Sequence, residues 1–195
     1  MNTRLKYWFR ALKIVIWISI LGFGLTLFNS IYRMTKSDEL VTEVKLTKSR
    51  FSSLEQGKLD LNSGMYLFNS KSLSDRLIFK HKVGKWGFLE SLFSLTTCVL
   101  LLLTVNGIST DNPFNLKVAQ RIIAMGIVYI AFGVINIATS YYMYAKIAHM
   151  ENEVTVRYIG FPDDLSRIKT GIIILVISFV YRIGVTYQDE NKLTV

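Results

Sequence analysis

The residues of this chain best suited to hold a divalent metal are two histidines. His81 and His149 each border a long apolar segment, and carboxylates such as Glu90 and Glu153 belong to the same side of the chain. Imidazole nitrogens and carboxylate oxygens are common ligands of divalent ions. The sequence contains no HExxH, HxxxH or paired-cysteine motif that would support such a site. The two histidines are therefore weak candidates, and we expect no metal and no cofactor.

Other motifs that would indicate an enzyme are missing from the sequence. It has no phosphate loop, nucleophile elbow or dinucleotide fingerprint. The net charge of +9 comes from Lys and Arg residues that flank apolar segments, which indicates attraction to anionic membrane lipid. No basic helix interleaved with aromatic residues is present. We therefore expect neither an enzyme nor a protein that binds nucleic acid directly.

Four apolar segments determine the expected fold class. Of the 195 residues, 51% are hydrophobic, which is high for a soluble domain. A helix needs about 20 predominantly apolar residues to cross a bilayer. Segments of this kind cover residues 14–32, 86–105, 118–145 and 168–187. We predict an all-α membrane protein, a single membrane domain with four transmembrane helices.

The polar connections after the first and third predicted helices carry strand signals. Residues 33–82 contain EVKL at 43–46 and, after a turn sequence at 62–64, MYLF at 65–68. The later connection alternates through EVTVRY at 153–158. Because four crossings put both connections on one side of the membrane, they can combine in a small sheet. Unpaired loops are an equal alternative.

Charge predicts the orientation in the membrane. The N-terminal tail carries Arg4, Lys6, Arg10 and Lys13 and no acidic residue, which favours a cytoplasmic N-terminus. Residues 33–82 carry ten Lys and Arg residues, which argues for the opposite orientation. That segment also carries six acidic residues, and charge counting is weakest for long structured loops. We predict cytoplasmic termini and an extracytoplasmic loop 33–82.

Small residues recur at every seventh position along the third predicted helix. The row of small residues consists of Ala119, Gly126, Gly133 and Ser140. The row three positions further on includes Tyr129 and Asn136. Small residues let membrane helices approach closely, so we interpret the pattern as a packing seam, with Gly171 and Ser178 as counterparts. An unpaired Asn136 amide at membrane depth is costly, and we expect a partner on another helix or subunit. A polar cavity lined by Tyr129 and Asn136 is the alternative.

Two charged residues lie furthest inside the apolar segments, and their depths predict that they do not pair. Glu90 and Arg182 lie on helices that run the same way, at depths that differ by roughly 15 Å. We expect Arg182 to reach Asp111, Asp189, Glu190 or lipid phosphate by extending along its helix. Glu90 lies towards basic groups at the opposite end.

The stretch DNPFNLKVAQRI, residues 111–122, separates the second and third predicted helices. Pro113 is tolerated at the first helical position, because its missing N–H would be unpaired there. Phe114 is placed to anchor in the membrane interface, and Arg121 can reach lipid phosphate. The candidate caps are Asp111, Asn112 and, for a later helix start, Asn115.

Two short motifs stand at the start of the third predicted helix and at the C-terminus. The first is Pro113-Phe114 followed by Arg121-Ile122 and Gly126, and the second is the ending YQDENKLTV at 187–195. Together they resemble a family of small bacterial four-helix membrane proteins that is classed only as a domain of unknown function. Members have a Pro-Phe segment before the third helix and a tail that closes in Leu-Thr-Val or Leu-Thr-Ile. They are often encoded beside a helix-turn-helix regulator. The resemblance covers residues 86–195, and the first polar loop departs from it by being longer.

The resemblance implies a multi-pass protein of the bacterial inner membrane that serves as a sensor or as the membrane partner of a transcriptional regulator. It implies no catalytic residue. We expect a cytoplasmic regulator to contact the face that bears Pro113, Phe114 and the C-terminal tail. The alternative is an oligomeric transporter or permeability factor for small molecules or lipids, with a homo-oligomer built around the third-helix seam. The candidate interface residues are Asp111, Pro113, Phe114, Arg121 and Arg182.

Overall fold

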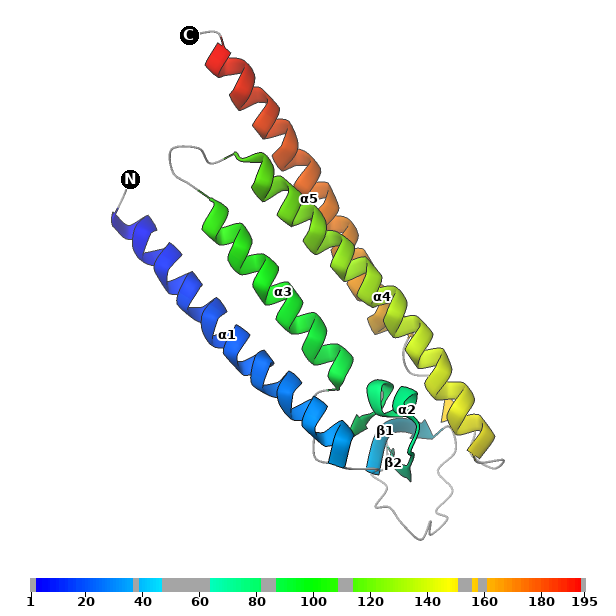
Figure 1. The fold of residues 1–195 in the computed structure, drawn as a ribbon. Helices are drawn as coiled ribbons and strands as arrows, with labels where there is room; N and C mark the ends of the chain where they lie inside the picture. The colour runs from blue at the N-terminus through cyan, green and yellow to red at the C-terminus, as the bar shows by residue number, and fades with distance from the viewer. Residues whose placement is uncertain are drawn as a thin grey trace. The chain divides into compact units, whose positions relative to one another are not determined.

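The computed structural model describes most of the chain and contains four long helices and a small sheet (Figure 1). The described residues are 3–36, 39–46, 64–81, 87–108, 114–150, 156–157 and 161–193. In chain order, the elements are α1 (Thr3–Lys36), β1 (Glu39–Leu46), β2 (Gly64–Asn69), α2 (Leu73–Ile78), β3 (Lys80–His81), α3 (Phe88–Gly107), α4 (Leu116–Met150), β4 (Val156–Arg157) and α5 (Phe161–Leu193).

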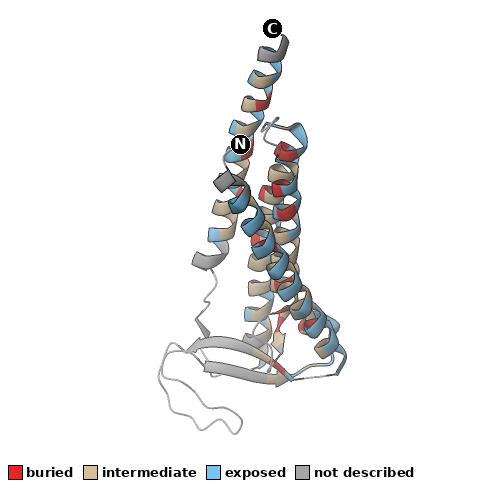
Figure 2. Cartoon of the chain, turned by 90° about the vertical axis from the view of Figure 1, so that its left-hand side faces the viewer, coloured by how far each residue is buried: buried red, intermediate tan, exposed pale blue. Residues whose placement is uncertain are grey.

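The four long helices are long and apolar enough to cross a membrane. Each contains an apolar window of 18 residues, which falls within Tyr7–Lys36, Phe88–Gly107, Leu116–Lys146 or Leu165–Glu190. Many residues along these helices are exposed (Figure 2). The exposed large apolar side chains include Trp17 at 55%, Leu25 at 70% and Phe179 at 65%. An apolar surface of this extent requires lipid around it. The predicted four-helix membrane fold is therefore confirmed, and the chain is a multi-pass membrane protein.

Three of the helices are longer than the apolar segments that predicted them. The apolar segment 118–145 lies within an α4 of 35 residues, and α1 and α5 have 34 and 33 residues. A bilayer needs only about 20 residues of helix, so these helices continue beyond the apolar core. The reason is that polar residues such as Lys36 or Gln188 are compatible with a helix in water.

The chain divides into two compact units. The helical unit comprises Met1–Gly24, Phe93–Gly133 and Leu165–Val195, and the sheet unit comprises Leu25–Leu92 and Val134–Asp164. In the helical unit, Ile16 of α1 forms a buried cluster with Leu102 and Val105 of α3. Phe9 and Ile20 pack against this cluster. Apolar contact therefore joins α1 to α3.

The sheet combines two connections that are far apart in the sequence. Antiparallel pairing joins β1 to β2 from Glu39↔Asn69 to Val44↔Gly64. The same strand pairs with β3 at Leu40↔His81 and with β4 at Lys45↔Arg157. This confirms a β-containing element formed by the loops after the first and third predicted helices, and it rules out the unpaired alternative for the paired residues. Residues 37–38, 47–63 and 82 of the first loop and 151–155 and 158–160 of the second lie outside the described residues.

A small apolar core supports the sheet. Leu40 of β1 is fully buried, and Phe79, which follows α2, is 1% exposed. The rings of Phe68 and Phe79 meet edge to face with centroids 4.8 Å apart, a favourable aromatic geometry. These contacts attach the short helix α2 to the sheet. The segment Leu73–Ile78 has only six residues, fewer than the window of about 11 in which a helical period is read, and α2 was not predicted.

Candidate functional site

The Pro-Phe segment and the C-terminal part of α5 meet in the structure. The backbone N–H of Phe114 donates to Gln188 Oε1 at 3.3 Å, and the Phe114 ring centroid lies 5.3 Å from that of Tyr181. A Cβ at Gly184 would lie 2.7 Å from the Phe114 ring, so only glycine permits this approach. Phe114 nevertheless stays 39% exposed. We call Phe114, Tyr181, Gly184 and Gln188 the Phe114 surface.

The cap of α4 comes later in the chain than the proline. Asn115 Oδ1 accepts the Lys117 N–H at 2.9 Å, and the Asn115 carbonyl accepts the Val118 N–H at 3.0 Å. Of the two predicted starts of this helix, the later one, capped by Asn115, is therefore confirmed, because Asn115 satisfies free N–H groups of the first turn. The Asn115 N–H itself donates to Tyr181 Oη at 3.2 Å. Asp111, Asn112 and Pro113 lie outside the described residues.

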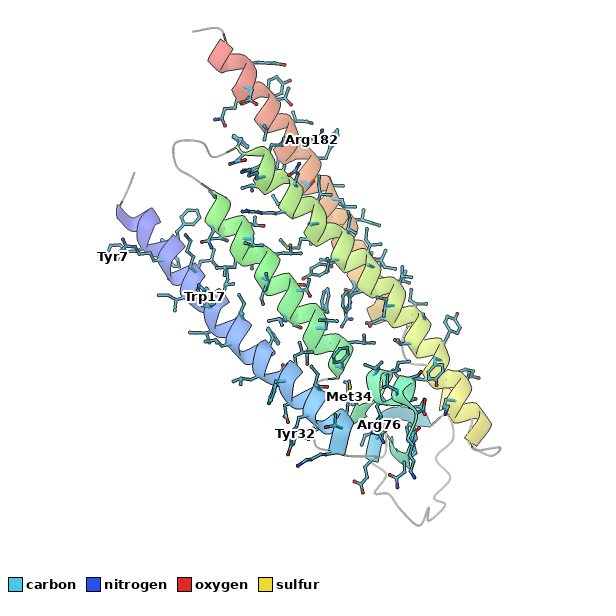
Figure 3. The ribbon with its side chains drawn as sticks, in the orientation of Figure 1. Tyr7, Trp17, Tyr32, Met34, Arg76 and Arg182 are labelled. Carbon is cyan, nitrogen blue, oxygen red and sulfur yellow. The ribbon has the colours of Figure 1, made fainter. Side chains whose placement is uncertain are left out.

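Arg121 contacts the end of α3. Its Nη1 donates to the carbonyl oxygen of Leu103, and a Cβ at Gly107 would lie 2.7 Å from that nitrogen. A guanidinium near the C-terminus of a helix is favoured by the helix dipole. In this structure the Arg121 head group therefore binds a helix end, whereas lipid phosphate was expected. Arg182, the other predicted interface arginine, lies exposed on α5 next to Tyr181 in sequence (Figure 3).

The glycines of the predicted seam face α5. A Cβ at Gly171 would lie 2.8 Å from the Gly126 carbonyl oxygen and 3.0 Å from the Ile130 nitrogen. A Cβ at Gly133 would lie 2.5 Å from Ile168 Cγ1. Such close backbone approach is typical of small residues between membrane helices. A second copy of the chain could reach Gly126 and Gly133 only if α5 moved away. The other buried residues of these rows are Ala119 and Ser178, which are 0% and 2% exposed.

The polar members of the predicted seam have different surroundings. The ring of Tyr129 packs edge to face on Phe93 of α3, with centroids 4.9 Å apart. Asn136 and Ser140 are half-buried. The Asn136 carbonyl accepts the Thr139 hydroxyl at 2.9 Å, but no described residue bonds the Asn136 side-chain amide. The partner expected for this amide is therefore not found in the described part of the chain.

A buried carboxylate in the sheet unit was not singled out from the sequence. Asp75 of α2 is 0% exposed. Its Oδ1 accepts the Tyr142 hydroxyl at 2.8 Å, and its Oδ2 accepts the Ser70 hydroxyl at 2.5 Å. Lys146 Nζ lies 3.1 Å from the same Oδ2. Because Tyr142 and Lys146 are one turn apart on α4, the carboxylate ties α2 to α4.

Arg76, the next residue, ties α2 to α1. Its Nη1 donates to the Met34 carbonyl at 2.7 Å (Figure 3), and its Nε donates to the Ser70 carbonyl at 3.2 Å. Met34 belongs to the last turn of α1, where carbonyl groups lack a partner within the helix. In the sequence, Asp75 and Arg76 are adjacent residues of opposite charge in a polar loop. Such neighbours are usually solvent-exposed, so nothing in the sequence indicated that Asp75 is buried. Lys146 also follows the end of the predicted segment 118–145, so no sequence signal joined these residues.

The surroundings of Asp75 lower the pKa of its carboxyl group. Burial alone raises the pKa, but hydrogen bonds from Ser70, Tyr142 and Lys146, with the charge of Lys146, outweigh burial and hold the pKa below its usual value of 3.8. A depressed pKa means that the carboxylate stabilises the fold at pH values above 3.8. That contribution is lost as the pH falls through the lower value of the folded state.

We predict that acid removes the contribution of Asp75. The melting temperature of the wild type minus that of Asp75→Asn, measured in detergent, should be constant near neutral pH and shrink below about pH 4. Subtracting the variant cancels the titration of the other groups. A difference that stays constant down to about pH 3 would contradict this assignment.

Glu90 pairs at its own end of α3. Its Oε1 lies 3.6 Å from Lys80 Nζ, and its Oε2 accepts the Gly87 N–H at 3.3 Å. A glutamate three residues after the cap that binds the cap N–H forms half of a capping box. The described side chains contain no group of three or more potential metal ligands. The side chains of His81 and His149, the weak metal candidates, lie outside the described ones.

Comparison with known families, proteins and structures found no similar protein: no family model, curated protein or solved structure matches the chain. The resemblance to the four-helix bacterial family therefore rests on the two short motifs.

Proposed function

We propose that the chain is a non-enzymatic integral membrane protein of the bacterial inner membrane that acts through binding. The Phe114 surface contacts a cytoplasmic helix-turn-helix regulator, and the sheet unit responds to a ligand or to the state of the envelope. The observation that carries the proposal is the docking of Phe114 onto α5. It joins the two sequence motifs, 74 positions apart at Phe114 and Gln188, in one surface.

The Phe114 surface has the properties of a binding site for a protein. Lipid anchoring accounts for an exposed aromatic side chain. It does not account for the hydrogen bond to Gln188 or the close approach of the ring to Gly184, which fix the ring on α5. Aromatic anchors held in one orientation are typical of the centres of protein interfaces. Asp189 and Glu190 are exposed immediately after Gln188, and they complement the basic surface of a DNA-binding partner.

The proposed route between the sheet unit and the partner is α4. This helix is continuous from Leu116 to Met150. Its later part binds Asp75 through Tyr142 and Lys146, and its cap, Asn115, binds Tyr181 of the Phe114 surface. A ligand that alters the contacts of Asp75 therefore acts on the helix whose first turn is attached to the proposed binding surface.

The proposal requires that a helix-turn-helix regulator is encoded beside the chain, and the absence of such a gene would overturn it. With that regulator co-expressed, the measurement is its transcriptional output. Phe114→Ala should change the output as much as deletion of the whole chain does. Phe179→Ala is the matched control, because Phe179 lies on α5, the helix that Phe114 contacts, and is 65% exposed. It should leave the output unchanged, and immunoblots of the membrane fraction should show equal amounts of both variants. A variant that carries both Phe114→Ala and a deletion of residues 188–195 would overturn the proposal if the regulator's output stayed unchanged.

A further inference from the structure

Arg167 of α5 lies against an aromatic cluster that α3 and α4 form. Its guanidinium carbon is 5.1 Å from the centroid of the Phe93 ring. Phe93 in turn packs against Tyr129 and Phe132, with centroids 4.9 Å away in both cases. A guanidinium over an aromatic ring is held by cation–π attraction. We call Phe93, Tyr129, Phe132 and Arg167 the Arg167 cradle.

One nitrogen of the Arg167 cradle is left without a hydrogen bond by the described part of the chain. Nη1 of Arg167 is buried and has no partner among the described residues. Leaving a buried charged donor unpaired costs more than leaving a neutral one unpaired. Thr97, one turn from Phe93 on the same face of α3, has a buried hydroxyl that no described residue bonds. In contrast, Ser91 and Thr104 on α3 donate to carbonyls four residues earlier. Two unpaired groups on helices that meet at Phe93 indicate a polar ligand.

The depth and chemistry of Arg167 identify the ligand class. Arg167 directly precedes the apolar segment 168–187, which places it at the boundary of the membrane-spanning part of α5. Lipid phosphates lie at this boundary, and a guanidinium presents a planar fork that matches two phosphate oxygens. The aromatic side chains exclude water and so strengthen the contact. We propose that the Arg167 cradle binds the phosphate of an anionic phospholipid headgroup.

The binding experiment uses the full chain, purified in uncharged detergent and depleted of lipid. Binding of phosphatidylglycerol is measured by native mass spectrometry, beside phosphatidylcholine and inorganic phosphate. We expect phosphatidylglycerol to bind the wild type most tightly. Arg167→Gln should weaken that binding about tenfold more than Lys169→Gln. Lys169 is the matched control, because it is exposed two residues further along α5 and its substitution changes the net charge equally.

Arg167→Lys tests the planar guanidinium fork separately from its positive charge. It also tests whether any loss of binding comes from misfolding. It keeps the net charge, and its melting temperature without lipid should stay near that of the wild type. We expect it to lose most of the phosphatidylglycerol binding. If Arg167→Gln and Lys169→Gln weakened phosphatidylglycerol binding equally, general attraction between positive charge and anionic lipid would explain the effect, and the proposed site would be overturned. The site would also be overturned if Arg167→Lys bound phosphatidylglycerol as tightly as the wild type does. Binding of inorganic phosphate or phosphatidylcholine as tight as that of phosphatidylglycerol would overturn the lipid assignment.

Discussion

Replacing Asp75 with alanine is expected to release α2 from α4 and to destabilise the sheet unit by about 2–3 kcal/mol. The carboxylate is fully buried, and it accepts the hydroxyls of Ser70 and Tyr142 besides binding Lys146. Alanine leaves the two hydroxyls and the Lys146 ammonium without this acceptor. Amide hydrogen exchange, followed by mass spectrometry on peptides that cover residues 64–81, should show the loss of protection.

Two further substitutions make the Asp75 experiment specific. Asp75→Asn keeps the shape and one acceptor oxygen, so we expect an intermediate loss of protection. Asp189→Ala removes an exposed carboxylate from α5 and should leave the exchange of residues 64–81 unchanged. Wild-type protection in Asp75→Ala would show that the carboxylate does not hold α2 in place.

Replacing Gly171 with alanine is expected to force α4 and α5 apart. The added Cβ would lie 2.8 Å from the Gly126 carbonyl oxygen and 3.0 Å from the Ile130 nitrogen. Both are backbone atoms of α4, so no side-chain rotation relieves the contact. Overpacking of this kind costs about 1–3 kcal/mol, and Gly171→Leu should cost more. The measurement is the apparent melting temperature in detergent.

Gly24 provides the matched control for Gly171. Both glycines lie inside long apolar helices, but a Cβ at Gly24 would meet no described atom within 4 Å. Gly24→Ala should therefore raise the melting temperature slightly, because alanine favours a helix over glycine by about 1 kcal/mol. Similar melting temperatures for Gly171→Ala and Gly24→Ala would contradict the close packing of α4 on α5.

The elements of this protein could be predicted from the sequence because each depends on a local pattern. An apolar stretch such as 86–105 must form its backbone hydrogen bonds internally within lipid, and a helix is the structure that does so in a single segment. The alternation at 43–46 and the apolar run at 65–68 likewise indicated strands at β1 and β2, with unpaired loops as the equal alternative. The helix ends were less predictable, since α4 and α5 continue through polar residues that carry no apolar period.

The partners of individual side chains were decided only by the tertiary structure. Asp75 and Lys146 are 71 positions apart and meet at 3.1 Å, and no period or spacing relates them. Arg121 could reach lipid phosphate by its position in the sequence, but the approach of α3 to α4 offers it the Leu103 carbonyl. Arg167 follows a polar connection, and only the packing of three helices places it on Phe93. A local pattern determines which segments become helices and strands, whereas a binding site depends on which of their faces meet.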